Sequence, residues 1–314
     1  MAYSVVFLGT PGFAVPCLEA VHNHPEFDVK LVVSQPDRPA GRKMKLKPSD
    51  VKTKALELNL PVVTPETVNT IAFREQIAEL NVDAAIVVAF GQILGQKFLD
   101  LFPKSCVNVH GSLLPRWRGA APIQRSIMEG DQTTGVCLQV MVKKLDAGAV
   151  IGEREIPIHT ETTATSLYKD LSDLGADLLV TDYLKFLSGS IDPIEQDESL
   201  VTYAHKIEKS EGIINWNLSA FSISCQIRGL SMGPQCWTFR DGKKLKIHDV
   251  RALAKEGSRP GEVLSVEKDH FVVACGQNAL AIYEVQPESK PRMLVSDYLR
   301  GYSLEPGYVF ESPQ

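Results

Sequence analysis

The chain has 314 residues, of which 44% are hydrophobic and 23% are charged, as is typical of a globular protein with a buried core. No apolar run reaches the ~18 residues that read as a membrane span, and the N-terminus lacks the basic region of a signal peptide, so we expect a cytoplasmic protein. The net charge of -5 divides into -6 for residues 1–203 and +1 for residues 204–314, which is compatible with a polyanionic partner for the second part.

At ~100 to 200 residues per domain, the length predicts two domains. Six cysteines are scattered without any CxxC pair, which argues against a zinc site and a disulfide framework. We therefore expect buried thiols and no metal.

The first element is an apolar run from Ser4 to Leu8, closed by Gly9-Thr10-Pro11-Gly12 and followed by apolar residues at helical spacing. This pattern predicts the opening βα unit of a doubly wound sheet in an α/β, Rossmann-like domain. The glycines do not spell GxGxxG. The loop from Gly9 to Phe13 is either a structural turn or a phosphate contact made through its free N–H groups.

A second strand, from Asp28 to Val33, leads into a long loop that is rich in basic residues. Between Gln35 and Lys54 there are seven basic residues, namely Arg38, Arg42, Lys43, Lys45, Lys47, Lys52 and Lys54. Such a run is either a solvated surface or, because long loops in compact domains are commonly functional, a set of phosphate contacts. We favour phosphate contacts.

Two helices and a buried strand come next. Ser49-Asp50 caps a helix through about Leu58, and Asn69 begins another helix that is expected to point Ile71, Phe73, Ile77 and Leu80 inward. Residues 84–89 form an apolar strand that Gly91 ends.

The next strand ends on a polar pair. Asn108 and His110 are two residues apart near the end of this short apolar strand, so both side chains point to one face. A carboxamide beside an imidazole could stabilise an oxyanion and move a proton, or the pair could simply fasten the following turn. Ligands of such sheets bind beyond the carboxyl ends of the strands, where Phe90-Gly91 and His110-Gly111 emerge.

Asp146 lies at the tip of a loop between two further strands. A helix over 122–128 precedes a strand over 134–142, and a returning strand runs over 148–158. An Asp followed by Ala147-Gly148 is by itself most often a turn residue. A helix over 162–187 closes domain 1–187, and residues 188–203 have the composition of a linker.

Residues 204–314 change character. A helical stretch over 219–230 is followed by short strands with regular turn signals, which predicts a small OB-like β-barrel. A basic group surrounds the first hairpin, but few aromatic residues are placed for base stacking. The basic group is Arg240, Lys243, Lys244 and Lys246.

Several motifs together resemble those of one family. Asn108-Val-His110-Gly-Ser-Leu-Leu-Pro115 with a downstream Leu145-Asp146-Ala-Gly148 is similar to the formyltransferases that use 10-formyltetrahydrofolate. The strings Ser112–Gln124 and Gln35–Arg42, and the spaced motif from Ala204 to Trp216, resemble the members of that family that act on methionine carried by the initiator tRNA. The resemblance covers almost the whole chain, including the C-terminal domain.

The resemblance implies the activity and its residues. It implies formyl transfer from 10-formyltetrahydrofolate to the α-amino group of methionine on initiator tRNA, for translation initiation. Asn108, His110 and Asp146 would be the catalytic trio. The folate site would be lined by Phe90, Gly91, Gln92, Ser112, Leu113, Leu114 and Pro115. The tRNA would be contacted by Arg38, Arg42, Lys43, Lys45, Lys206 and Lys209.

Two other functions stay open at this point. The same folate chemistry could serve another acceptor, namely a sugar-nucleotide amine, glycinamide ribonucleotide or water. The basic loop and the barrel argue against these acceptors, since a small acceptor needs neither. A nucleic-acid-binding module with a vestigial enzyme domain is a further alternative, against which the trio argues. Nothing in the sequence demands more than a monomer.

Overall fold

The computed structural model describes residues 2–40, 45–257 and 259–311. The chain divides into two compact units. The first unit ends at Pro122 and also includes Thr133–Ile156 and Tyr168–Ala204; the second includes Ile123–Gln132, Pro157–Leu167 and the chain from His205 onward.

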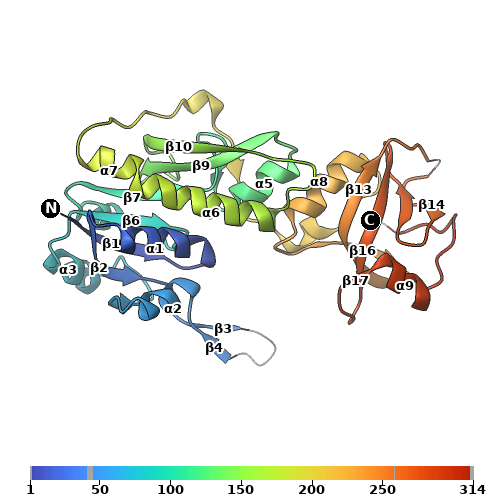
Figure 1. The fold of residues 1–314 in the computed structure, drawn as a ribbon, viewed down its shortest axis with the longest axis horizontal. Helices are drawn as coiled ribbons and strands as arrows, with labels where there is room; N and C mark the ends of the chain where they lie inside the picture. Colours follow the sequence, from blue (N-terminus) through green and yellow to red (C-terminus); the bar gives the residue numbers. More distant parts are fainter. Residues whose placement is uncertain (1, 41–44, 258, 312–314) are drawn as a thin grey trace. The chain divides into compact units, whose positions relative to one another are not determined.

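The first unit is built on a seven-stranded sheet in the order β10-β9-β7-β6-β1-β2-β5 (Figure 1). Its strands are β1 (Tyr3–Gly9), β2 (Phe27–Val33), β5 (Val62–Val63), β6 (Ala84–Val88), β7 (Ser105–His110), β9 (Thr133–Val140) and β10 (Val150–Pro157). The strands from β7 to β5 are parallel, whereas β7 pairs with β9 in antiparallel fashion. The Rossmann-like fold class predicted from the sequence is confirmed.

Helices cover both faces of this sheet. They are α1 (Val15–Asn23), α2 (Asp50–Glu57), α3 (Ile71–Glu79), α4 (Gln96–Leu99), α6 (Ala164–Val180) and α7 (Asp182–Leu187). In β1, the side chains of Val6 and Leu8 join one core cluster with Phe73 of α3 and Phe98 of α4. On the opposite face α1 packs beside α6, where the thiol of Cys17 contacts a backbone carbonyl of α6 (Figure 1). Because helices cover both faces of the sheet, side chains on both faces of a central strand are buried. This explains the continuous apolar sequence of such a strand.

Several local predictions needed correction. Ile71 is 67% exposed, because it lies two residues, about 200° of helical rotation, before the buried Phe73 of α3. The helix predicted over 162–187 is two helices, with Thr181 between them at φ −118° and ψ −75°. The loop after β2 contains a hairpin of β3 (Arg38–Ala40) and β4 (Lys45–Lys47).

Residues 188–203, predicted to be a linker, group with the first unit although most of their side chains are exposed. Ile194 and Val150 exchange backbone hydrogen bonds of 2.8 Å, and β11 (Tyr203–Ala204) pairs in parallel with β8 (Arg118–Gly119). Composition alone misses this because backbone pairing needs no apolar side chains.

The second unit is an antiparallel sheet in the order β12-β13-β16-β15-β14, with β17 paired to β16. Its strands are β12 (Cys236–Arg240), β13 (Lys243–Leu253), β14 (Val263–Val266), β15 (Phe271–Ala274), β16 (Ala279–Pro287) and β17 (Met293–Leu294). Its helices are α5 (Pro122–Met128), of which Pro122 belongs to the first unit, α8 (Ala220–Gly229) and α9 (Val295–Gly301).

The C-terminal segment closes this sheet. Phe239 of β12 bridges to Glu311, and Glu262 beside β14 bridges to Val309, so one segment pairs with both edge strands. Trp216 is buried in the core, stacks on Phe310 and donates its indole N–H to Thr238 at 3.1 Å. Closure removes the exposed edges of the sheet, which agrees with the barrel expected from the sequence.

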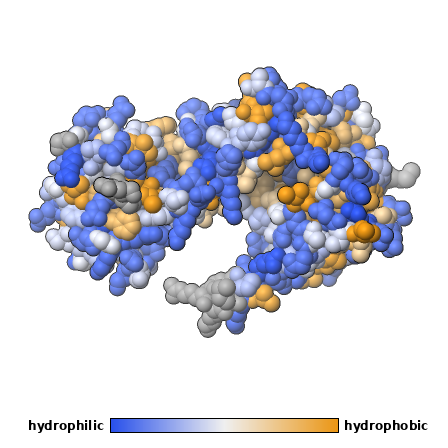
Figure 2. Space-filling view, turned by 180° about the vertical axis from the view of Figure 1, so that it is seen from behind, coloured by the Kyte–Doolittle hydropathy of each residue, from blue (hydrophilic) through white to orange (hydrophobic). Residues whose placement is uncertain are grey.

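The surface and the cysteines are those of an ordinary globular chain. All six cysteines are free and buried, as expected. Figure 2 shows a mainly hydrophilic face with apolar residues in small separate groups. Within the described residues, no helix is both long and apolar enough to cross a membrane.

Candidate active site

The strand β7 carries Asn108 and His110 to the carboxyl edge of the sheet. Asn108 is in register with Val87 of β6 and Gln139 of β9, so these three side chains share one face. On the other face of β7, Val109 lies against Gly175 of α6, where an added Cβ would be 2.7 Å from Val109 Cγ1. This close packing fixes the distance between β7 and α6, and with it the position of Asn108 and His110.

His110 is buried, and its orientation is set by the loop that follows β7. Its Nε2 lies 2.9 Å from the carbonyl oxygen of Trp117. A carbonyl oxygen only accepts, so Nε2 carries the hydrogen and donates it. Nδ1 is therefore the nitrogen that can gain or lose a proton, and it faces Asp146 Oδ2 at 3.8 Å.

Asp146 is held from three sides, in a loop where it has a positive φ of 45°. Its Oδ2 accepts from the backbone N–H of Gly119 at 2.9 Å, and its Oδ1 accepts from the amide of Gln139 at 3.1 Å. Its own carbonyl oxygen accepts from Gln196 Nε2 at 2.8 Å. Asp tolerates a left-handed backbone in turns, so what distinguishes this carboxylate is that both of its oxygens and its own carbonyl are fixed by hydrogen bonds.

Two carboxamides beside this pair have groups without partners. The carbonyl oxygen of Gln139 is buried and has no hydrogen-bond partner within the described residues. Asn108, half-buried in β7, makes no side-chain hydrogen bond to any described residue. Because buried polar groups are normally paired, these two adjacent amides fit a polar ligand at the sheet edge.

The predicted folate-site residues surround the same edge. The backbone carbonyl of Phe90 accepts from Thr10 Oγ1 and Gln35 Nε2, and the side chain of Gln92 is fixed to the backbone of Pro65 and Val68. Gly91 has a φ of +85°, which a side chain would strain.

In the second segment predicted to line the folate site, Ser112 is buried and donates to the carbonyl oxygen of Arg116 at 2.7 Å, and Leu114 is also buried. Leu113 packs close to Gly135, and Pro115 follows a cis peptide bond. The side chains of Gln92 and Ser112 are thus engaged with the protein, so these segments shape the edge mainly through their backbones and apolar surfaces.

The predicted tRNA residues lie on both units. Arg38 pairs with Glu66 beside the β3–β4 hairpin, Lys45 is exposed on β4, and Arg42 and Lys43 are outside the described residues. Lys206 and Lys209 are exposed in the second unit, where Arg125 fixes their segment. Arg125 donates to the carbonyl oxygens of His205 and Lys206 and pairs with Glu211.

Two hydrogen bonds weaken the argument for a phosphate contact at the first loop. The N–H of Phe13 donates to the hydroxyl of Tyr168 at 2.6 Å, and Ala14 donates to Pro11. These two N–H groups are therefore not available to an anion.

Sequence reasoning missed three residues of this site: Gln139, Gln196 and the carbonyl of Trp117. Gln139 had a usable signal, because it is a polar residue inside an otherwise apolar strand. Gln196 lies in the predicted linker, and a backbone carbonyl has no sequence signature. Within the described residues, no group of three or more His, Cys, Asp or Glu is arranged to hold a metal ion.

Comparison with known families gives two matches. Residues 3–182 match the family model "Formyl transferase", and residues 206–303 match "Formyl transferase, C-terminal domain".

Curated relatives match over nearly their full length. The chain is 50% identical over 309 residues to the methionyl-tRNA formyltransferase of Bdellovibrio bacteriovorus, covering 96% of this chain and 97% of the relative. It is 42% identical over 310 residues to the enzyme of the same name from Pseudoalteromonas translucida, covering 97% and 96%.

Solved structures share the fold at lower identity. An N-formyltransferase from Helicobacter canadensis, in complex with folinic acid and dTDP-3-aminofucose, has a TM-score of 0.68 at 20% identity over 91% of this chain and 100% of that chain. HypX from Aquifex aeolicus with tetrahydrofolic acid has a TM-score of 0.64 at 16% identity, over 95% and 47%.

Proposed function

The chain belongs to the formyltransferase family, and from this premise we propose that it transfers the formyl group of 10-formyltetrahydrofolate to the α-amino group of methionine on initiator tRNA. The observation that carries the proposal is the grouping at one sheet edge of a carboxamide that has no partner among the described residues, Asn108, and an imidazole–carboxylate pair, His110 and Asp146. Formyl transfer needs a donor for a developing oxyanion and a group that moves a proton, and this grouping supplies both.

Catalysis begins with the amine of the acceptor. An α-amine titrates near ~8, and the neighbouring ester lowers that value, so a substantial neutral fraction exists at neutral pH and no strong base is required. 10-Formyltetrahydrofolate supplies the activated formyl carbon. Asn108 donates its amide hydrogen to the oxygen on which negative charge develops.

His110 moves the proton. Its Nε2 donates to Trp117, so Nδ1 accepts the proton that the attacking amine loses and returns it to the departing nitrogen. Asp146, fixed by Gly119 and Gln139, stabilises the imidazolium during this transfer.

The acceptor is a macromolecule in this proposal. The exposed lysines Lys45, Lys206 and Lys209 and the guanidinium of Arg38 are the groups we assign to tRNA phosphates. The folate is assigned to the edge formed by residues 90–92 and 112–115. We place the reaction in the cytoplasm and expect a monomer.

One acceptor assay tests the proposal. The protein is incubated with 10-formyltetrahydrofolate and, separately, methionyl initiator tRNA, uncharged tRNA, glycinamide ribonucleotide and an amino-sugar nucleotide. We expect formylation of methionyl-tRNA alone. Transfer to the sugar nucleotide without transfer to methionyl-tRNA would overturn the proposal, and wild-type turnover by Asp146→Ala would overturn the trio.

A further inference from the structure

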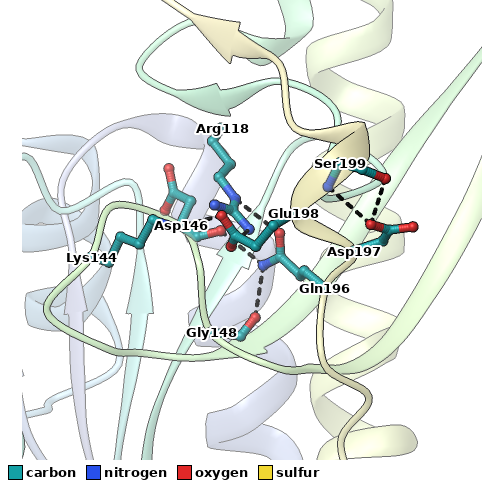
Figure 3. Close-up of polar contacts among 8 residues, drawn as sticks. All are labelled: Arg118, Lys144, Asp146, Gly148, Gln196, Asp197, Glu198 and Ser199. Carbon is teal, nitrogen blue, oxygen red and sulfur yellow. Dashed lines mark hydrogen bonds and ion pairs between the residues drawn. The ribbon is translucent and has the colours of Figure 1, made fainter.

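The segment from Ile194 to Ala204, which we call the strap, lies against the loop that carries Asp146. The strap begins where the backbone of Ile194 pairs with that of Val150, and it ends where β11 pairs with β8. Between these two points three of its side chains contact residues of the site, and Figure 3 shows the polar contacts of two of them, Gln196 and Glu198.

Gln196 holds the backbone of the Asp146 loop directly. Its amide Nε2 donates to the carbonyl oxygen of Asp146 at 2.8 Å and to that of Gly148 at 2.7 Å. One amide group thus fixes the chain at Asp146, the residue with positive φ, and again two residues later. The direction of the Asp146 carboxylate depends on that backbone.

Arg118 holds Gln196 in turn. Its guanidinium is completely buried, with Nε donating to Gln196 Oε1 at 3.0 Å and Nη2 donating to Glu198 Oε1 at 2.9 Å. Its Nη1 has no partner within the described residues. A buried guanidinium is rigid and strongly directional, so it orients the Gln196 amide with its nitrogen toward Asp146 (Figure 3).

The strap also fixes the backbone that contacts the catalytic pair. Thr202 accepts from the backbone N–H of Arg118 through its carbonyl oxygen and from that of Trp117 through Oγ1, each at 2.9 Å. The same short stretch provides the Trp117 carbonyl to His110 and the Gly119 N–H to Asp146. Both members of the pair therefore rest on chain that the strap holds.

We propose that Gln196, oriented by Arg118, is a positioning residue for formyl transfer that fixes the Asp146 carboxylate toward His110. The proposal rests on the proposed function, because it assumes that Asp146 acts in the reaction. In this proposal Gln196 acts through the backbone of Asp146 and Gly148, and we assign it no contact with a substrate. Its contribution is made through Asp146, and its loss reduces turnover because a misplacement of about 1 Å can lower a rate ~100-fold.

The exposed ion pair near Gln196 contributes less to holding the strap in place than the Gln196 amide does. Lys144 and Glu198 pair at 2.5 Å, but their side chains are 59% and 58% exposed, so this pair contributes little to stability. The Gln196 amide, with two short bonds to one loop, is the specific contact.

The test uses an isosteric substitution. Gln196→Glu keeps an oxygen for Arg118 but has no N–H for the carbonyl oxygens of Asp146 and Gly148. We expect kcat to fall about 10- to 100-fold with little change in KM for either substrate. Gln196→Met, which removes the donors without adding charge, must give the same result.

A matched control and a double variant separate positioning from general damage. Asp197→Asn changes the next residue of the strap, whose side chain accepts from the N–H and the hydroxyl of Ser199, and should keep wild-type kcat. In an Asp146→Ala background, Gln196→Glu should cause no further loss, since a residue that acts through Asp146 has nothing left to position.

The outcomes are distinct. The inference is overturned if Gln196→Glu lowers kcat by the same factor in the Asp146→Ala background as in the wild type. It is also overturned if both Gln196 variants keep wild-type kcat. Failure of the proposed function would instead appear as no transfer to methionyl-tRNA by the wild-type protein, or as full activity of Asp146→Ala alone.

Discussion

His110 donates its Nε2 hydrogen to the carbonyl oxygen of Trp117 at 2.9 Å, and this single bond decides which nitrogen faces Asp146. With Nε2 occupied, Nδ1 is left for proton transfer. Trp117 itself has a φ of 67°, in the left-handed region that a tryptophan rarely adopts. The strained residue is thus the one that orients the imidazole.

The first prediction concerns this imidazole. His110→Gln can keep a donor toward Trp117 but has no nitrogen that accepts and returns a proton. We expect kcat to fall about 100- to 10,000-fold, the usual contribution of a positioned acid–base group, while both KM values stay close to wild type. Steady-state kinetics with methionyl-tRNA give the answer. His22→Gln, in the last turn of α1, is the control, and a fully active His110→Gln would remove the imidazole from the mechanism.

The second prediction concerns the carboxamide of Asn108. Asn108→Asp preserves the shape of the side chain but replaces the N–H donor with an acceptor. Loss of one oxyanion donor typically lowers kcat about 100- to 1,000-fold, so we expect a decrease of that size in single-turnover formylation. The melting temperature should report whether β7 stays folded. If only the KM for the folate rises, Asn108 binds the ground state and the transition state equally, and its role as oxyanion donor is refuted.

The third prediction concerns the lysines of the second unit. Lys206→Ala combined with Lys209→Ala removes two exposed charges, so methionyl-tRNA affinity should fall and the slope of log K against log salt should shrink by up to about 2. Turnover at saturating tRNA should be unchanged. The measurement is tRNA binding across a salt series.

The matched control for the lysines makes the same change in net charge elsewhere in the second unit. Lys255 and Lys290 are also exposed, and their double replacement by Ala should leave affinity close to wild type. Equal losses from both pairs would mean that overall charge, and no particular segment, attracts the tRNA.

The sequence predicted best those elements whose sequence patterns lie within a few neighbouring residues. The strand before Gly9 and the cap Ser49, which accepts from the Lys52 N–H, follow from apolar periodicity and capping chemistry. Asn108 and His110 could be placed on one face because strand alternation is a local rule. Asp146 could be placed at a loop tip because two strands flank it.

The contacts that the sequence did not reveal are long-range or use the backbone. Gln196 is 50 residues from Asp146 in sequence, and its segment has the composition of a linker. The Trp117 carbonyl and the Gly119 N–H exist in every peptide, so nothing in their side chains marks them. The prediction that Ile71 points inward was wrong because it lies two residues before Phe73, about 200° around the helix, and so points to the opposite face.

The last prediction concerns the pH dependence of stability and rests on His248 in β13. Burial, and then the charge of Arg292, lower the pKa of His248 to about 4, with Lys246 acting in the same direction. A hydrogen bond with Gln286 and the charge of Glu284 act in the opposite direction.

The sign of this effect follows from proton binding. In the unfolded chain His248 has the ordinary His pKa of 6.5. Between pH 6.5 and about pH 4, His248 is therefore protonated in the unfolded state but not in the folded state. The free energy of unfolding therefore contains the full contribution of His248 above pH 6.5 and loses it as the pH falls toward 4. His248→Gln removes the titrating group, so its free energy of unfolding should decrease less over this range. Urea unfolding at several pH values checks this, and parallel pH profiles for the variant and the wild type would contradict it.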